Sequence, residues 1–299
     1  MEYNFIEKNS RPWVCEKKIM DIMNNPHQSH SATPLAMFRS LWRNRQLIFQ
    51  MTRREIAARY RGSMIGLAWS FINPILMLLV YTFVFSVVFK ARWNVGGDES
   101  KTDFAIILFA GMIVFNLFAE LINRAPGLVT SNVNYVKKVV FPLEILPGVA
   151  LGSALFHSLI SLFVLLLAQF IFNLTLPWTI VLFPLVLLPL IFFSMGIAWF
   201  LSALGVFVRD VGQITGILTT ILMFMSAVFY PLSALPREYQ FWLGLNPLVL
   251  IITESRKVLI LGELPDWLTL IVASFISLVI AFAGYWWFQK VRKGFADVI

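Results

Sequence analysis

The chain has 299 residues, of which 59% are hydrophobic and only 13% are charged. Soluble domains carry about 25% charged residues, so this composition excludes an ordinary soluble domain and indicates a membrane protein. The net charge of +8 fits cytoplasmic anchoring of membrane helices better than nucleic-acid binding, and the single cysteine, Cys15, excludes an intrachain disulfide and a thiolate metal cluster.

Residues 1–33 are polar and of mixed composition. They are expected to form a flexible cytoplasmic tail. His27 and His30 lie in this tail, and a solvated linker is preferred over a weak metal site there.

Residues 34–61 combine apolar side chains at helical spacing with many arginines. This pattern, which includes Phe38, Trp42 and Phe49, predicts a basic amphipathic helix at the membrane surface. The alternative is an ordinary amphipathic helix packed on protein. The surface location is favoured because a membrane span follows directly.

Long charge-free runs predict the fold class, an all-α polytopic membrane protein with one six-span domain over residues 62–299. Gly62–Phe89 contains no charged side chain and is longer than the roughly 20 residues that cross a bilayer. Residues 145–208 are also uncharged but too long for one crossing, so a turn is expected at residues 173–177. The predicted spans are 64–89, 104–122, 145–172, 178–207, 211–232 and 268–288.

The charges of the loops predict the orientation. Residues 123–142 carry Arg124, Lys137 and Lys138 with no acid, and the segment after residue 289 is also basic. The segments 90–103 and 233–267 are neutral to acidic. The positive-inside rule therefore places both termini in the cytoplasm.

Residues 233–267 contain apolar pieces too short to cross, interrupted at Asn246–Pro247. Two re-entrant or interfacial helices on the outer side, between the fifth and sixth spans, are predicted. A plain extracellular loop is the alternative.

The chain lacks the motifs of several enzyme classes. It has no P-loop, no paired Cys-x-x-Cys, no His-Glu-x-x-His and no acid-rich metal motif. His157 is the one titratable group deep in a predicted span, where a packing histidine is preferred over a proton relay. The chain is therefore not expected to be an enzyme or to hold a cofactor, and the energy for any transport is expected from another polypeptide.

Four stretches in order carry a resemblance to a known family. They are MTRREIAARYRGSMIGLAWSFINP at 51–74, NYVKKVVFPLEILP at 134–147, the segment 236–262 with LNPL and TESRKVLILG, and KGFADV at 293–298. Together they resemble the permease subunits of type-2 ABC exporters for polysaccharide, namely O-antigen, capsule and teichoic acid. The resemblance covers roughly residues 35–299.

The resemblance implies a subunit of the bacterial inner (plasma) membrane that works as two copies with a separate ABC ATPase dimer, which binds ATP and Mg. The implied cargo is a lipid-linked glycan, with O-antigen favoured and undecaprenyl diphosphate or another lipid as carrier. An exporter of a drug or lipid is the alternative, and a membrane enzyme of glycan-lipid assembly is a more distant one.

The resemblance also implies site residues. A helix coupling to the ATPase is expected at Ala125, Gly127, Asn132, Asn134 and Tyr135, with a passive connector as the alternative. Contact with the carrier-lipid headgroup is expected at Arg53, Arg54, Arg59 and Arg61, which simple anchoring also explains. Channel-lining aromatics are expected at Trp69, Tyr81, Phe85, Phe115, Phe118, Phe224 and Tyr230. Asn73 and Asn116 are at depth, suited to bonding sugar hydroxyls or neighbouring helices. An outer gate is expected at Tyr239, Trp242, Asn246, Pro247, Glu254 and Arg256.

Overall fold

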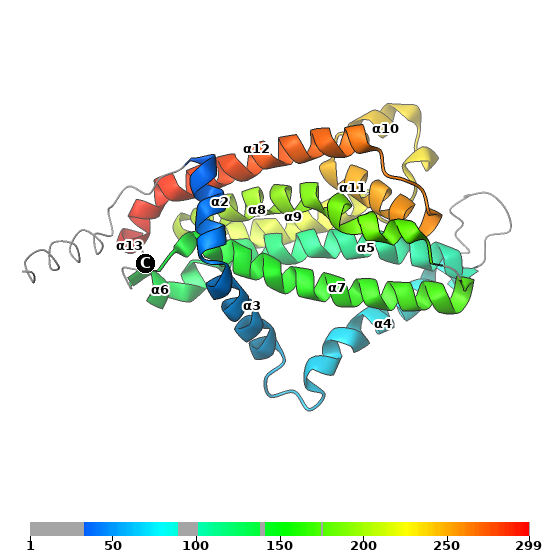
Figure 1. Cartoon of the computed structure of the whole chain (residues 1–299), viewed down its shortest axis with the longest axis horizontal. Helices are drawn as coiled ribbons and strands as arrows, with labels where there is room; N and C mark the ends of the chain where they lie inside the picture. The colour runs from blue at the N-terminus through cyan, green and yellow to red at the C-terminus, as the bar shows by residue number, and fades with distance from the viewer. Residues whose placement is uncertain (1–32, 89–100, 138–140, 175, 299) are drawn as a thin grey trace, which may run out of the picture.

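The computed structural model describes residues 33–88, 101–137, 141–174 and 176–298, and the regular elements in these ranges are all helical. The predicted tail lies almost wholly outside the described residues, as does most of the 90–103 loop. Figure 1 shows four long helices, α5, α7, α8 and α12, running side by side along the molecule. Their bounds are Lys101–Arg124, Leu146–Asn173, Phe183–Phe207 and Trp267–Val291.

Five segments are long and apolar enough to cross a membrane, and they match five of the predicted spans. They are Gly66–Phe85, Phe104–Gly127, Leu143–Asn173, Trp178–Phe207 and Trp267–Gly294. The first consists of a 3₁₀ turn at Gly66–Ala68, α4 at Trp69–Tyr81 and part of a π-helix at Thr82–Val88.

The segment predicted as the fifth span is shorter than expected. Its helix, α9, runs over Val211–Met225, and these 15 residues extend roughly 22 Å at about 1.5 Å per residue. The helix ends because Ala227 adopts a left-handed backbone with φ of 52°, a conformation that no sequence signal at that position announces.

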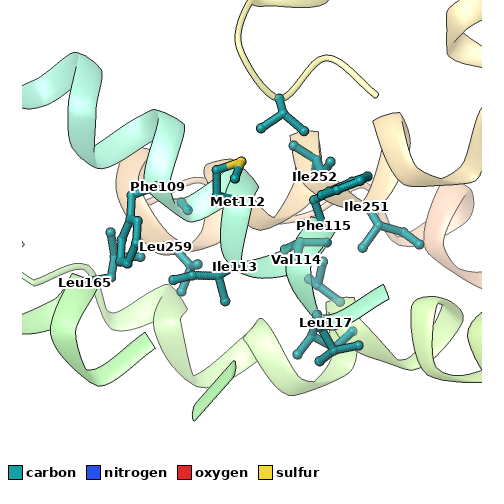
Figure 2. Packing of buried hydrophobic residues seen from close by; sticks show 14 of the residues in the cluster. Phe109, Met112, Ile113, Val114, Phe115, Leu117, Leu165, Ile251, Ile252 and Leu259 are labelled. Carbon is teal, nitrogen blue, oxygen red and sulfur yellow. The ribbon is translucent and has the colours of Figure 1, made fainter. Parts of the chain in front are cut away.

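Helix α5 forms the centre of the molecule. Its side chains are buried almost continuously from Phe104 to Phe118. Figure 2 shows this packing, in which residues of α5 meet Leu165 of α7 and Ile251, Ile252 and Leu259 from the segment 247–261. Burial on all sides explains why α5 reads as apolar around its whole circumference.

Helices α8 and α12 approach closely through small residues. A Cβ atom built at Gly284 would overlap the carbonyl of Gly196, and one at Gly196 would lie 2.5 Å from the carbonyl of Ile280. Small residues at helix crossings let two backbones come together inside a membrane. Buried Trp199 then packs edge-on against Tyr285, with ring centroids 5.3 Å apart.

The predicted amphipathic segment forms two helices, α2 at Pro34–Arg43 and α3 at Arg45–Arg59. Both contact protein: α2 buries Met37, and Thr52 of α3 donates to the carbonyl of Val149 on α7 at 3.3 Å. Their other faces expose large apolar side chains, among them Trp42, which is 72% exposed.

The expected turn between the third and fourth spans is confirmed in the described residues. Helix α7 ends at Asn173 and Leu174 takes a left-handed backbone at the C-cap. A 3₁₀ turn at Trp178–Leu182 then leads into α8.

Two short helices lie at the end of the bundle opposite α2 (Figure 1). They are α10 at Arg237–Gly244 and α11 at Pro247–Arg256, and a π-helix at Lys257–Leu261 follows. The predicted interruption at Asn246–Pro247 is confirmed: the side chain of Asn246 accepts from the N–H of Leu248 at 3.0 Å and caps α11. Asp266 caps α12 in the same way, and its hydrogen bonds from Thr269 hold the pKa of its carboxyl below the usual value.

Candidate functional site

A cavity of about 420 Å³ is lined on one side by the end of α3 and by α4, and on the other side by α5 and α7. Two predicted channel aromatics, Trp69 and Tyr81, line it together with Asn73 and Asn116. Aromatic faces beside amide groups are able to stack on sugar rings and bond their hydroxyls. The cavity therefore has the chemistry of a carbohydrate-binding surface.

Asn116 is the exposed residue within the otherwise buried stretch of α5 between Phe104 and Phe118. A polar side chain inside a membrane span is costly when it faces hydrocarbon. Its position on the cavity wall indicates that this face of α5 meets water, a polar ligand or another polar surface.

A hydrogen-bonded polar cluster forms part of the cavity wall. The guanidinium of Arg59 donates to Glu120 at 2.7 Å and lies 2.9 Å from Nδ1 of His157. His157 Nδ1 in turn lies 3.0 Å from both carboxylate oxygens of Glu120, and the hydroxyl of Tyr60 is 3.1 Å from Nε2. The cluster joins α3, α5 and α7, so the histidine is hydrogen-bonded rather than isolated.

The arginines predicted to contact a lipid headgroup have different surroundings. Arg53, Arg54 and Arg61 are exposed, whereas Arg59 is held by Glu120 although its side chain is 43% exposed. A carboxylate partner reduces the positive charge that Arg59 can offer to a phosphate.

The segment after α5 is folded as short turns rather than one continuous helix. It comprises 3₁₀ turns at Ala125–Gly127 and Thr130–Asn132 and one helical turn, α6, at Val133–Lys137. Ala125 is fully buried, while Gly127 and Asn134 are exposed. Tyr135 stacks on Phe141 with ring centroids 4.3 Å apart, which fixes the far end of the segment.

This segment is connected to α3. Arg124, the last residue of α5, forms an ion pair with Glu55 of α3. A cavity of about 560 Å³ also separates the two, and its walls hold Arg54 and Arg61 on one side and Asn132 and Tyr135 on the other. The predicted headgroup and coupling residues therefore face one another.

The remaining predicted channel aromatics divide into two groups. Phe115 and Phe118 are buried in the core, and Phe118 stacks on Phe193 at 5.9 Å. Phe85 and Phe224 join a second aromatic cluster through Phe229, with ring centroids 5.7 and 5.4 Å from that of Phe229.

This second cluster also includes Tyr230, whose hydroxyl donates to the carbonyl of Phe224 at 2.7 Å. The sequence alone did not separate core aromatics from surface ones, because the spans are apolar all round.

Two of the predicted gate residues are buried anchors. Arg256 donates to the carbonyls of Ile107, Ala227 and Val228 at 3.1, 2.8 and 2.6 Å. Glu254 accepts from Lys257 at 2.8 Å and from the N–H of Asp266 at 2.9 Å.

The other predicted gate residues lie nearer the surface. Tyr239 and Trp242 on α10 are 58% and 70% exposed, and Pro247 begins α11 after the Asn246 cap. The amide of Asn246 also donates to Ser226 at 3.2 Å, which ties α11 to the end of α9.

Comparison with known proteins decides the family. A sequence profile described as "ABC-2 type transporter" matches residues 46–260. The chain is a member of the ABC-2 type transporter family.

The similar proteins are all named as export or transport proteins for polysaccharides. The O-antigen export system permease protein RfbA of Myxococcus xanthus is 30% identical over 267 residues, covering 89% of this chain and 100% of that protein. RfbA of Klebsiella pneumoniae is 23% identical over 255 residues, with 85% and 95% covered, and the polysialic acid transport protein KpsM of Escherichia coli is 24% identical over 243 residues, with 77% and 88% covered.

As a permease subunit the chain is not itself an enzyme, and the ATPase of such a transporter is a separate subunit. Among the described residues, no group of three or more His, Cys, Asp or Glu side chains is placed to hold a metal ion.

Proposed function

We propose that this chain is the membrane subunit of an ATP-driven exporter that moves a lipid-linked polysaccharide, O-antigen first among the candidates, across the bacterial inner membrane. The observation that carries the proposal is the cavity that combines Trp69 and Tyr81 with the exposed Asn116 of an otherwise buried helix. The relatives named as O-antigen export permeases and polysialic acid transport proteins support the class of cargo.

The proposed arrangement has six spans with both termini in the cytoplasm. Figure 1 supports a common side for the ends, because α2 and α13, at Phe295–Val298, lie at the same end of the bundle. In this arrangement α9 is the fifth of the six crossings, although its helix is short, and the backbone beyond Met225 completes the passage against protein. The basic residues of 123–142 lie on the cytoplasmic side.

Two copies form the channel in this proposal. The glycan passes along the cavity wall, where it stacks on Trp69 and Tyr81 and bonds to Asn73 and Asn116. The second aromatic cluster, of Phe85, Phe224 and Tyr230, continues that path. Phe115 and Phe118 take part only through a rearrangement of α5, because they are buried in the single chain.

The carrier headgroup meets Arg53, Arg54 and Arg61, each adding about 1 kcal/mol near an anionic surface. Arg59 contributes after its bond to Glu120 opens. The same arginines face the coupling segment across a shared cavity, which supports a link between headgroup and ATPase.

The ATPase pushes on the segment that contains Ala125, Gly127, Asn132, Asn134 and Tyr135. Because Arg124 is paired with Glu55, a movement of this segment is carried to α3. Because Glu120 holds Arg59, the same movement reaches the wall of the cavity as a rigid-body displacement.

The outer gate consists of α10 and α11, lying at the outer boundary as re-entrant or interfacial helices. Tyr239 and Trp242 present the movable surface, and Asn246 with Pro247 forms the hinge. Arg256 fixes the base of this unit to α5 and to the turn after α9, and Glu254 fixes it to Asp266 at the start of α12.

Deletion of the coding sequence, with staining of surface glycan, tests the proposal. The expected result is loss of long-chain glycan from the surface and accumulation of the lipid-linked chain inside the cell, restored by the intact sequence. Unchanged surface glycan together with lost resistance to a drug would replace the proposal with a small-molecule exporter.

A further inference from the structure

A third cavity, of about 470 Å³, lies between α2 and the end of α12. Apart from Phe141, which stacks on Tyr135, its lining residues lie outside the sites described above. Three arginines line it, Arg39 and Arg43 of α2 and Arg292 beyond α12, against a single acid, Glu144. The lining therefore carries a net charge of +2.

The one acid, Glu144, already has hydrogen-bond partners on both carboxylate oxygens. Arg292 donates to Glu144 at 2.6 Å and to the carbonyl of Phe141 at 2.9 Å, while the hydroxyl of Ser40 donates to the other carboxylate oxygen at 2.8 Å. Arg39 and Arg43 stand one turn apart on the same face of α2, where like charges repel. Among the described residues neither makes an ion pair, so an anion between them would relieve the repulsion.

A buried polar atom in the wall of this cavity lacks a hydrogen-bond partner. Gln289 is 3% exposed, lines the cavity, and its Oε1 has no hydrogen-bond partner while Nε2 donates to the hydroxyl of Tyr285 at 2.8 Å. Turning the amide over lets the tyrosine hydroxyl donate to Oε1 and leaves an unpaired amide N–H on a residue of the cavity wall. Such a donor suits a phosphate oxygen.

The N-terminus of α2 also faces this space. Thr33 caps the helix by accepting from the N–H of Ala36 at 3.2 Å, and both residues line the cavity. The positive end of the helix dipole adds to the attraction for an anion.

The rim of the cavity is apolar and exposed. Leu35, at the opening, is 68% exposed, and Phe38 and Trp42 on the same helix are 46% and 72% exposed. The cavity also lies where the last candidate span ends, at Gly294. A ligand with a phosphate in the basic cavity and acyl chains beside Leu35 would match both the polar lining and the apolar rim.

We infer that this cavity binds the phosphate of an anionic membrane lipid, separately from the proposed carrier-lipid arginines of α3. The inference depends on the α2 end of the bundle lying at a membrane surface but not on the identity of the exported cargo. Bound lipid would join α2 to α12 and to the segment around Glu144.

Lipid titration of the intact exporter, with its ATPase, tests the site by native mass spectrometry. The probes are phosphatidylglycerol, phosphatidylcholine and inorganic phosphate. The wild type is expected to retain phosphatidylglycerol over phosphatidylcholine. Arg39→Gln with Arg43→Gln should weaken this retention about thirtyfold, and Arg43→Gln alone about fivefold, taking each surface arginine at its usual contribution.

A matched control removes two charges at the same end of the molecule. Arg45 and Lys290 lie outside the cavity, and Arg45→Gln with Lys290→Gln should leave retention unchanged. Equal binding of phosphatidylglycerol by wild type and by the single and double cavity variants would overturn the site. Displacement of the lipid by an equal concentration of inorganic phosphate would overturn the lipid assignment, because the cavity would then be a site for free phosphate.

Discussion

Replacement of Arg256 by methionine should release the outer helices from the bundle. The side chain is 6% exposed and holds the carbonyls of Ile107, Ala227 and Val228. The carbonyl of Ile107 lies within α5 and keeps its place in the helical ladder. The carbonyls of Ala227 and Val228 lie in the turn after α9, and within the described chain no backbone N–H outside the helices donates to either.

The magnitude follows from those two carbonyls. A hydrogen bond from a charged donor contributes about 1.5–3 kcal/mol, so losing both costs about 3–6 kcal/mol. That is more than a hundredfold in the equilibrium between attached and detached α11. Arg256→Lys keeps the positive charge but not the guanidinium N–H groups that point at three carbonyls, so an intermediate loss of α11 attachment is expected.

Hydrogen exchange of the purified exporter measures this detachment directly. Amides of α11 should lose more than a hundredfold of protection in Arg256→Met, whereas Arg237→Met, an exposed arginine on α10, should leave them unchanged. Protection of α11 within threefold of the wild type in Arg256→Met would refute the anchoring role.

Three further perturbations test other parts of the account. Glu120→Gln removes the negative charge that pairs with Arg59 and should weaken the contact between α3 and α5 by about 1 kcal/mol. Export should fall several-fold while insertion and co-purification with the ATPase persist, and normal export measured by glycan staining would exclude a role for this cluster. Gly284→Ala forces α8 and α12 apart and should lower thermal stability by about 2–4 kcal/mol. Gly212→Ala is the control, because its added methyl group meets open space and should not lower stability. Equal melting temperatures for the two variants would contradict the close packing. Asn116→Leu removes a polar group from the cavity wall and should raise thermal stability by a few tenths of a kcal/mol or more while lowering export; a rise in stability with full export would show that Asn116 does not contact the cargo.

Much of the fold could be predicted because each span is an uninterrupted apolar run. The turn near Leu174 and the break at Asn246–Pro247 were also predictable, since a charge-free run of double length requires a reversal and Asn-Pro begins a helix. The early end of α9 was not predictable. Its left-handed residue is Ala227, and neither Gly nor Pro occurs there.

The partners of charged residues were the least predictable features. Arg59 reads as a surface cation, yet its carboxylate partner stands 61 positions later and its histidine contact 98 positions later. Arg256 is expected in an outer gate, with no buried partner predicted for it, yet it is buried and backbone carbonyls from two other segments converge on it. Only the packing of α5 against α7 and α11 brings such groups together.

The central claim is that this chain moves a polysaccharide outward only with work from a separate ATPase. Purified chain and ATPase, reconstituted into vesicles with a lipid-linked glycan, test it most directly. The account predicts that the glycan crosses the bilayer upon ATP addition, and that omitting the ATPase or using a non-hydrolysable nucleotide abolishes the movement. Equal movement by the chain alone, without the ATPase, would contradict the account.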